Sequence, residues 1–561
     1  MGKDELAAFS LQRMTTPFEI SDRFTEQYAD LVPITATYLG ITGRDHLIGD
    51  LSPELHGRLD DLYRAARADL SAHLDDPDPV QAFAAIVMSR WLDERIERFE
   101  AGEWRRNLNH IASPFQYLID TFDVMPKGTA HEWANIVSRL EGFDSMLDGY
   151  RQCLAAGVGA MDTVAARQVE ALLDQLDAAA SKESRFLAFP ESAEAAGVDR
   201  DPVAAAVDRA REACSLLAEW LRSDYLPHAR SEDAVGRDEY LMGADKYLGM
   251  TVDPDETYEW GWSEVRRVMV DLERTAAEID PEMSLTEVIE LLETDPGRAA
   301  ATREEFVDFI SGIQEQAISQ LSGAHFDVPE PLRTVTVSIA PPGGSLGAWY
   351  IGPTEDFSRP GSIWYAPGER ELLPYWQEVS TAYHEGFPGH HLQVGTAVLE
   401  RDKLSRFHRM AIWYSGAGEG WALYAERLMD ELGFFEKAEY RLGLLASQLF
   451  RALRVVIDIG CHLKRPIPAD APLHPGDVWD YDRAVDYMTQ IGSQPHDVAE
   501  SEVTRYLGWW GQAISYKVGE REILDIRDQA RRAGDLDLKH FHRTLLEAGA
   551  IRLDHLREVM S

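Results

Sequence analysis

The hydrophobic pattern of the first half of the chain is helical. In Leu55–Leu74, Val80–Phe99 and Pro202–Leu221, apolar residues recur every three or four positions, which places them on one face of an α-helix. Clusters of Pro, Gly and Asp, such as DDPDP at 75–79, separate these segments and favour turns. The region from about residue 20 to about residue 325 is therefore expected to form successive amphipathic helices.

The pattern changes near residue 330, where three short segments are typical of strands. Arg333–Ala340 alternates and is rich in β-branched residues, and Ala348–Gly352 and Gly361–Pro367 are two further strand candidates. Helical periodicity then returns and continues to the end of the chain, as in Leu444–Leu463. This order of elements predicts a mainly α fold with a large helical body, a cleft and a small antiparallel β-sheet.

The sequence shows no obvious linker between domains. Pro- and Gly-rich positions are short and scattered, and no short repeat is present. We expect one large helical unit over residues 1–561, in which a helical lobe of residues 1–330 could face a lobe of residues 331–561 that carries the sheet.

Composition narrows the classes of partner. The net charge is -41, from 55 Lys and Arg against 96 Asp and Glu, which argues against nucleic acid and against an anionic membrane surface. The three cysteines have no C-x-x-C spacing, and the first ten residues contain no apolar core of a signal peptide. We expect a cytoplasmic protein that binds neither nucleic acid nor membrane, and a homodimer stays open.

The segment YHEGFPGHHLQ carries the most specific chemistry. An adjacent His-Glu pair followed by further histidines resembles the zinc motif H-E-x-x-H, in which two histidines bind the ion and the glutamate activates water. Here Pro388 occupies the position four after His384, and His390 and His391 follow at i+6 and i+7. In a straight helix, neither spacing would bring a second imidazole to the same ion.

Pro388 and Gly389 offer a solution, because proline interrupts a helix and glycine tolerates unusual dihedral angles. A distortion at residues 386–389 would return His390 to the position of a normal second ligand, with His391 as the alternative. The competing interpretation is a helix that ends at Gly386, with the histidines in an incidental loop.

A third ligand is expected from another helix, because catalytic zinc keeps three protein ligands and one open position. SGAGEGWALYAERL offers Glu419, and Glu426 lies seven residues further on the same helical face. Taken alone, Glu419 is also explained as an acid favoured at a helix N-terminus, and Glu426 as a solvated charge.

HEGFPGHH and EGWALYAE resemble the bacterial domain-of-unknown-function family 885, and RPGSIWY, RVVIDIGCH, GQAISYKVG and LLEAGAIRLDHL extend this likeness over most of the chain. More distantly, the two motifs resemble the carboxypeptidase Taq family of helical zinc peptidases. That resemblance implies a zinc site with His384, His390 and Glu419 as ligands, and it aligns Glu426 with a second acid. The insertion of Phe387 and Pro388 departs from the peptidase pattern.

Further candidates surround this core. Tyr516 corresponds roughly to a late tyrosine of those peptidases and would stabilise an oxyanion, with Gln512 four residues earlier on the same face. Packing alone is an equal explanation for Tyr516. Arg359 and Arg505 are two candidates for binding a substrate carboxylate, and the sequence does not choose between them.

Arg454, Asp458 and His462 follow each other at intervals of four in an otherwise apolar helix. Such buried polar groups need partners, either as supports of a metal-bound histidine or as an internal network between helices. The internal network is slightly favoured, and a second metal at Asp458 and His462 is the weaker alternative.

The sequence therefore predicts a zinc-dependent hydrolase, in which Glu385 takes a proton from the attacking water and a peptide or small amide is the substrate. Iron or manganese would also suit two histidines and a carboxylate. The alternatives are a hydrolase of a non-peptide amide or ester, and a helical binding protein whose metal site is degenerate.

Overall fold

The computed structural model describes residues 15–340, 347–534 and 536–561, and it is dominated by helices. The helices of the first half are α1 (Pro17–Leu31), α2 (Pro33–Tyr38), α3 (Pro53–Leu70), α4 (Pro79–Glu100), α5 (Pro114–Val124), α6 (Ala130–Glu141), α7 (Phe143–Ala160), α8 (Ala166–Ala180), α9 (Phe189–Ala195), α10 (Arg200–Trp220), α11 (Arg237–Leu248), α12 (Pro254–Ile279), α13 (Leu285–Thr294) and α14 (Arg303–Leu321). The expected succession of helices before residue 325 is confirmed.

Helices also fill the second half of the chain. They are α15 (Glu378–Glu385), α16 (His390–Leu399), α17 (Arg406–Ala411), α18 (Ser415–Glu431), α19 (Ala438–Leu463), α20 (Tyr481–Asp486), α21 (His496–Gly508), α22 (Ser515–Ala533), α23 (Leu538–Ala548) and α24 (Leu553–Met560). Within the described ranges, no helix is both long enough and apolar enough to cross a membrane.

The starts of several helices follow directly from local sequence. Ser52 and Asp78 each stand before a proline, and their side chains accept hydrogen bonds from the free backbone N–H groups of α3 and α4. Proline suits the first helical position because its missing N–H would have no partner there. The clusters of Pro and Asp that predicted turns therefore also set where these helices begin.

The expected small sheet is present beside the helices. Its strands are β2 (Thr336–Ile339), β3 (Gly347–Ile351) and β4 (Ser362–Ala366), in the order β2-β4-β3, and β1 (Ala299–Ala300) pairs with β5 (Leu373–Pro374). β3 and β4 are antiparallel, whereas β2 lies parallel to β4 on its other side. β3 is therefore an edge strand, and β4 lies in the middle of the sheet.

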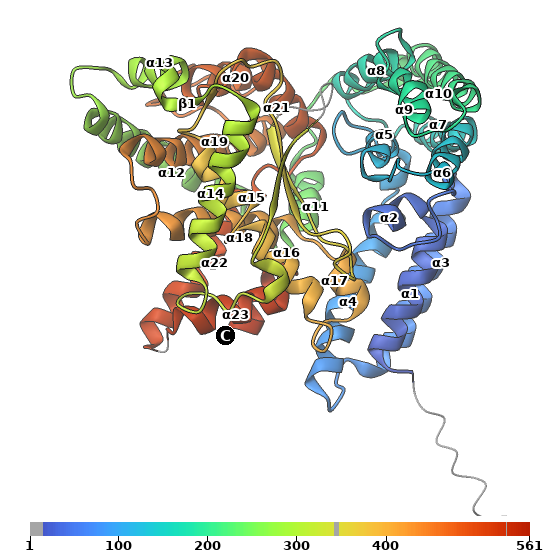
Figure 1. Cartoon of the computed structure of the whole chain (residues 1–561), viewed down its shortest axis with the longest axis horizontal. Helices are drawn as coiled ribbons and strands as arrows, with labels where there is room; N and C mark the ends of the chain where they lie inside the picture. Colours follow the sequence, from blue (N-terminus) through green and yellow to red (C-terminus); the bar gives the residue numbers. More distant parts are fainter. Residues whose placement is uncertain (1–14, 341–346, 535) are drawn as a thin grey trace, which may run out of the picture.

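The interior contains two large hydrophobic cores. The smaller one, from Leu108 to Tyr225 together with Ile34, belongs to the body of α5–α10 at the upper right of Figure 1. The larger one runs from Ile20 to Leu556 and collects side chains from both sides of residue 330. The segment that carries the metal motif lies in this larger core.

Two helices of the larger core cross at glycines. A Cβ on Gly420 of α18 would lie 2.5 Å from the carbonyl carbon of Gly519 of α22, and a Cβ on Gly519 would lie 2.0 Å from the carbonyl oxygen of Gly416. Only glycine permits such close backbone contact. Glu419 directly precedes Gly420, and Tyr516 lies one turn before Gly519. The crossing therefore brings Glu419 and Tyr516 into the same region.

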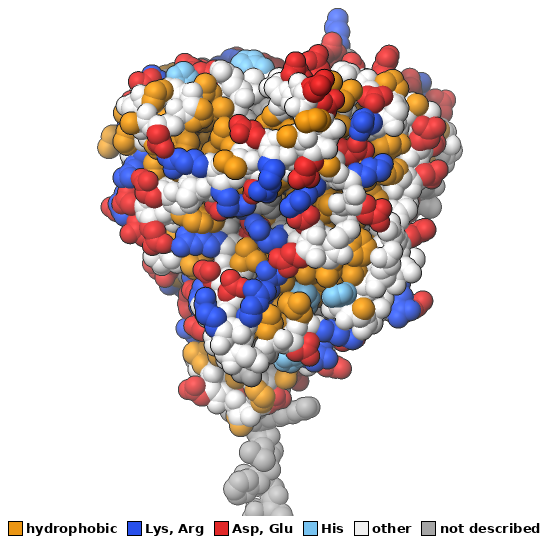
Figure 2. Space-filling view, turned by 90° about the vertical axis from the view of Figure 1, so that its left-hand side faces the viewer, with side chains coloured by type: hydrophobic (Ala, Val, Ile, Leu, Met, Phe, Trp, Pro, Cys, Tyr) orange, Lys and Arg blue, Asp and Glu red, His pale blue; other side chains and the backbone are white. Residues whose placement is uncertain are grey.

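The negative net charge is not evenly distributed over the surface. On the face shown in Figure 2, a band of Lys and Arg side chains crosses the middle among acidic and hydrophobic side chains. Among the described residues many Lys and Arg side chains form ion pairs with acidic ones, such as that between Arg267 and Glu264 at 2.8 Å. Basic and acidic side chains therefore lie close to each other on this face.

Candidate metal centre

The metal motif is interrupted as the sequence suggested. α15 ends at Glu385 and α16 begins at His390, so residues 386–389 leave the helical path. Gly386 has φ -93° and ψ -136°, and Gly389 has φ -74° and ψ -127°, both outside the helical region. The predicted distortion is confirmed, and it places His390 back beside His384.

Neither glycine of the interruption leaves space for a side chain. A Cβ on Gly386 would lie 2.2 Å from Oε1 of Gln314, and a Cβ on Gly389 would lie 2.0 Å from the carbonyl oxygen of His384. These distances are far inside van der Waals contact. At Gly389 the obstacle is backbone, so the path between the two histidines depends on glycine there, whereas a side chain at position 386 would have to displace the amide of Gln314.

Two side chains from other helices hold the interrupted segment in place. Gln314 of α14 donates to the carbonyl oxygen of Ala382 (2.7 Å) and accepts from the backbone N–H of Phe387 (2.7 Å). Trp421 of α18 donates from Nε1 to the carbonyl oxygen of Pro388 at 2.9 Å. Neither residue could be predicted from the sequence, because no local pattern links Gln314 or Trp421 to residues 386–389.

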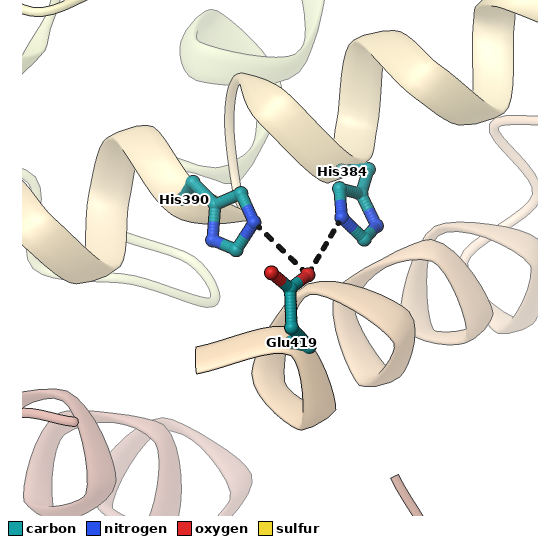
Figure 3. A group of neighbouring side chains, drawn as sticks. All are labelled: His384, His390 and Glu419. Atoms are coloured by element: carbon teal, nitrogen blue, oxygen red, sulfur yellow. Dashed lines mark hydrogen bonds and ion pairs between the residues drawn. The ribbon is translucent and has the colours of Figure 1, made fainter. Parts of the chain in front are cut away.

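His384, His390 and Glu419 meet at one point (Figure 3). Nε2 of His384 lies 3.2 Å from Oε2 of Glu419, and Nε2 of His390 lies 3.4 Å from the same oxygen. Ligand atoms about 2.1 Å from one tetrahedral zinc lie about 3.4 Å from each other, so these spacings suit a shared ion. Within residues 15–340, 347–534 and 536–561, no other group of three or more His, Cys, Asp or Glu meets the same test.

The opposite nitrogen of His384 faces Glu426. Nδ1 lies 2.7 Å from Oε1 of Glu426, and the other oxygen of Glu426 accepts a hydrogen bond from the hydroxyl of Ser380. A carboxylate at Nδ1 fixes the proton there and leaves the lone pair of Nε2 for a metal. Glu426, which looked like a solvated charge in isolation, is fully buried and fixes the orientation of the His384 ring.

The electrostatics of the cluster are those of a buried ionic group. Burial alone would lower the pKa of His384, but its hydrogen bonds with Glu419 and Glu426 raise that pKa to about 10. Burial would raise the pKa of Glu419, yet the imidazoles of His390 and His384 hold it well below its usual range. The site therefore attracts positive charge at the point between these three side chains.

His391 points away from the cluster. Its Nδ1 lies 3.1 Å from the hydroxyl of Tyr350, and its Nε2 lies 3.1 Å from the carbonyl oxygen of Leu332. Burial lowers the pKa of His391 to about 4, which keeps the ring neutral. Of the two histidines left open by the sequence, only His390 faces Glu419.

Glu385 and Tyr516 both line the cavity beside the cluster. Glu385 follows the ligand His384 directly, and burial raises the pKa of its carboxyl group. The ring of Tyr516 stacks over that of His384, with centroids 6.4 Å apart, and its hydroxyl accepts from Arg505 at 3.5 Å. The candidate base, Glu385, and the candidate for stabilising an oxyanion, Tyr516, therefore line the same cavity.

Two cavities meet at the cluster and form the predicted cleft. One of about 680 Å³ lies between β3, α15, α19 and α21, and one of about 660 Å³ reaches toward residues 95–117. Both are lined by Trp413, Glu419, Arg505 and Tyr516. A ligand in either cavity would therefore lie next to Glu419.

The two candidate carboxylate-binding arginines lie in different places. Arg505 lines both cavities, but it pairs with Glu502 at 3.2 Å and donates to Oε1 of Gln512 at 2.6 Å. Gln512 is buried and lines only the second cavity. Arg359 does not line either cavity, because it follows a surface turn held by Thr354 and Asp356.

Asp458 and His462 form a separate buried cluster. Asp458 accepts hydrogen bonds from the hydroxyl of Tyr240 (2.9 Å) and from the N–H of Gly511 (3.0 Å), and Nε2 of His462 donates to the carbonyl oxygen of Tyr506 (3.1 Å). Burial raises the pKa of Asp458 to about 8 and lowers that of His462 to about 4. These contacts join α19 to α11 and α21, as an internal network does.

The fold and the site together define a class: a mainly helical protein in which two histidines and a glutamate meet at the junction of two internal cavities. Within this class, the family described as "Bacterial protein of unknown function (DUF885)" matches residues 33–560, and the chain belongs to that family. No curated protein matches the sequence. The resemblance to the carboxypeptidase Taq family rests on the motifs alone and stays a prediction.

Solved structures share this fold over nearly the whole chain. A crystal structure from Colwellia psychrerythraea, described as a "putative lipoprotein", is 23% identical, with a TM-score of 0.83 and coverage of 97% of this chain and 99% of that chain. A "putative lipoprotein of unknown function" from Shewanella oneidensis is 17% identical, with a TM-score of 0.70 and the same two coverages. At these identities the likeness shows the fold alone, and the cytoplasmic location stays a prediction.

Proposed function

We propose that the protein is a zinc-dependent hydrolase that cleaves peptide bonds. The observation that carries this proposal is the convergence of His384, His390 and Glu419 on one point, with Glu385 beside them in the cavity. Two histidines and one carboxylate with an open side are the ligands of a hydrolytic zinc site. A zinc ion bound there would polarise a carbonyl group and lower the pKa of water.

The residues of the chain would divide the remaining work. Glu385 would accept the proton of the attacking water and deliver it to the leaving amine. Tyr516, whose hydroxyl is held by Arg505, would donate a hydrogen bond to the carbonyl oxygen as negative charge develops on it. Glu426 would keep His384 in the tautomer that binds metal through Nε2.

The sheet offers a place for an extended substrate. β4 (Ser362–Ala366) has neighbours on both sides and leaves no edge for a substrate. Among the described residues β3 pairs on one side only, with β4, and its residues Gly347–Tyr350 line the cavity that contains Glu385. A peptide would therefore add its backbone to β3, by the strand addition that many peptide-binding proteins use.

The test combines metal analysis with a substrate screen. Protein purified without chelator or affinity metal should contain about one zinc per chain, and it should cleave members of a mixed peptide library. Glu385→Gln should retain zinc and lose activity by several orders of magnitude, whereas the matched control Glu436→Gln, at an exposed position, should change neither.

Two outcomes would redirect the proposal. Protein that binds no divalent metal would favour a helical binding protein, and a zinc protein that cleaves only amides or esters outside the library would favour a non-peptide substrate. Full activity in Glu385→Gln would remove this residue from the mechanism. Iron or manganese in place of zinc would appear directly in the metal analysis.

A further inference from the structure

Arg451 on α19 is a cation that makes no direct ion pair with any described residue. Among the described residues no carboxylate lies within ion-pair distance of it, although it lines the cavity that contains Glu385. Its Nη1 donates to the hydroxyl and the carbonyl oxygen of Ser447, one turn earlier on the helix. Its Nε is buried, with no partner in the part of the chain that the structure describes.

The guanidinium groups next to Arg451 share one carboxylate, that of Glu502. Glu385 and Glu419 line the same cavity, but neither carboxylate lies within ion-pair distance of Arg451. Arg454 and Arg505 both pair with Glu502, at 2.7 Å and 3.2 Å, so one carboxylate serves two guanidinium groups. Arg451 adds a third guanidinium one turn from Arg454 on the same side of α19. A buried or partly buried charge of this kind is costly unless a partner neutralises it. An anionic ligand in the cavity would provide that partner.

The position of Arg451 relative to the cluster suits a peptide. Cζ of Arg451 lies 5.9 Å from the ring centre of Tyr516, which itself lies 6.4 Å from the ring centre of His384. Arg451 is therefore within about 12 Å of the imidazole of His384, a distance that three or four extended residues at about 3.5 Å each would span. A carboxylate up to about three residues from the cleaved bond can therefore reach Arg451.

We propose that Arg451 binds a carboxylate of the substrate and thereby selects peptides that carry one close to the cleaved bond. This inference rests on the proposed peptidase function and names the substrate class of that site. The carboxylate is either the free C-terminus of the peptide or an acidic side chain. Within the described ranges Arg451 is held only through Nη1, by Ser447, so the end of its guanidinium with Nη1 and Nη2 can still bind both oxygens of a carboxylate.

The other two candidates for this role are less suitable. Arg359 lies outside both cavities, and the guanidinium of Arg505 already binds Glu502 and Gln512. Arg451 is therefore the best candidate for two reasons: it lines the cavity, and the neighbouring arginines are already paired.

The experiment measures binding apart from cleavage. Zinc-loaded Glu385→Gln protein is titrated, with saturation-transfer NMR, against N-acetyl-tetra-alanine as the free acid, the same peptide as the C-terminal amide, and an amide with one glutamate in place of an alanine. At least one of the two carboxylate peptides should bind about tenfold more tightly than the plain amide, the usual strength of a charge-assisted contact. Which one binds more tightly identifies the source of the carboxylate.

Variants then assign the preference to one side chain. Arg451→Gln on the same background should reduce the preference to about twofold or less and leave binding of the plain amide unchanged, and Arg451→Lys should retain part of it. Arg359→Gln is the matched control and should leave the preference intact. An unchanged preference in Arg451→Gln, or equal binding of all three peptides by the parent protein, overturns the proposal.

The result is separable from that of the proposed function. Carboxylate-dependent binding that disappears in Arg451→Gln, in a protein whose native form cleaves no peptide, would support the role of Arg451 and refute the peptidase activity. Cleavage of the free acid and the amide at equal rates would support the activity and refute the role of Arg451. If Arg451→Gln does not fold, an Arg451→Lys protein with the full preference of the parent would equally refute the need for a bidentate guanidinium.

Discussion

Gly389→Ala tests whether the interruption between α15 and α16 creates the metal site. The new methyl group would lie 2.0 Å from the carbonyl oxygen of His384 and 2.4 Å from that of Tyr383. It would have to move by about 1 Å to reach a tolerable contact, and both obstacles are backbone atoms that cannot rotate away. His390 follows directly in the chain, so its imidazole would be displaced relative to His384.

The expected magnitude follows from the narrow tolerance of metal geometry. Ligand distances vary by only about 0.2 Å, so a displacement of about 1 Å should prevent His384 and His390 from binding one ion together. We expect zinc affinity to fall about 100-fold or more, a loss at least as large as that caused by changing a residue that supports a ligand. The overpacking should also lower the free energy of unfolding by about 1–3 kcal/mol.

The assay is competition for zinc with a chromophoric chelator, accompanied by thermal unfolding of the metal-free protein. Gly312→Ala is the matched control, because a Cβ at this position of α14 meets no atom within 4 Å. It should leave zinc affinity unchanged and stabilise the helix slightly. A Gly389→Ala protein with the zinc affinity of the native protein would refute the structural reasoning for the site.

Two further predictions concern the supports of the site and the response to acid. Glu426→Gln keeps the shape of the side chain but removes the negative charge beside Nδ1 of His384, so zinc affinity measured by chelator competition should fall about 10- to 100-fold; an unchanged affinity would contradict the orienting role of Glu426. Burial lowers the pKa of His408 to about 3 and that of His555 to about 4, so in acid the unfolded chain takes up these protons before the native protein does. Above pH 6.5 these histidines do not reduce the free energy of unfolding. As the pH falls toward 4, protonation of the unfolded chain lowers the free energy of unfolding by up to about 1.4 kcal/mol per pH unit for each histidine. Urea unfolding of His408→Gln between pH 7.5 and 5 should show a smaller loss of stability than the native protein, and curves with equal slopes would argue against this origin.

The features that could be predicted from the sequence are those that neighbouring residues determine. The helices were predictable because their apolar spacing is local, and Glu385 and His384 were found through an adjacent pair with a known role. The distortion at Pro388 and Gly389 was predictable in kind, because these residues cannot continue a regular helix. Its direction, which turns His390 inward and His391 outward, depends on contacts with distant residues.

Other features depend on which segments pack together, and no local pattern contains that information. Gln314 and Trp421 hold the interrupted segment through hydrogen bonds from two separate helices. The edge position of β3 follows from the strand order, which neighbouring sequence does not determine. Arg451 became a candidate only when the partners of Arg454 were known.

The glycine crossing between α18 and α22 has a consequence for how mutation could change the candidate site. Since the backbones of Gly420 and Gly519 touch, there is no compressible layer of side chains between the helices that bear Glu419 and Tyr516. A substitution elsewhere cannot slide one helix along the other by a fraction of an ångström, as it could across an ordinary layer of leucines. Ion affinity and stabilisation of the reacting carbonyl should therefore rise and fall together, and variants that separate the two properties should be rare.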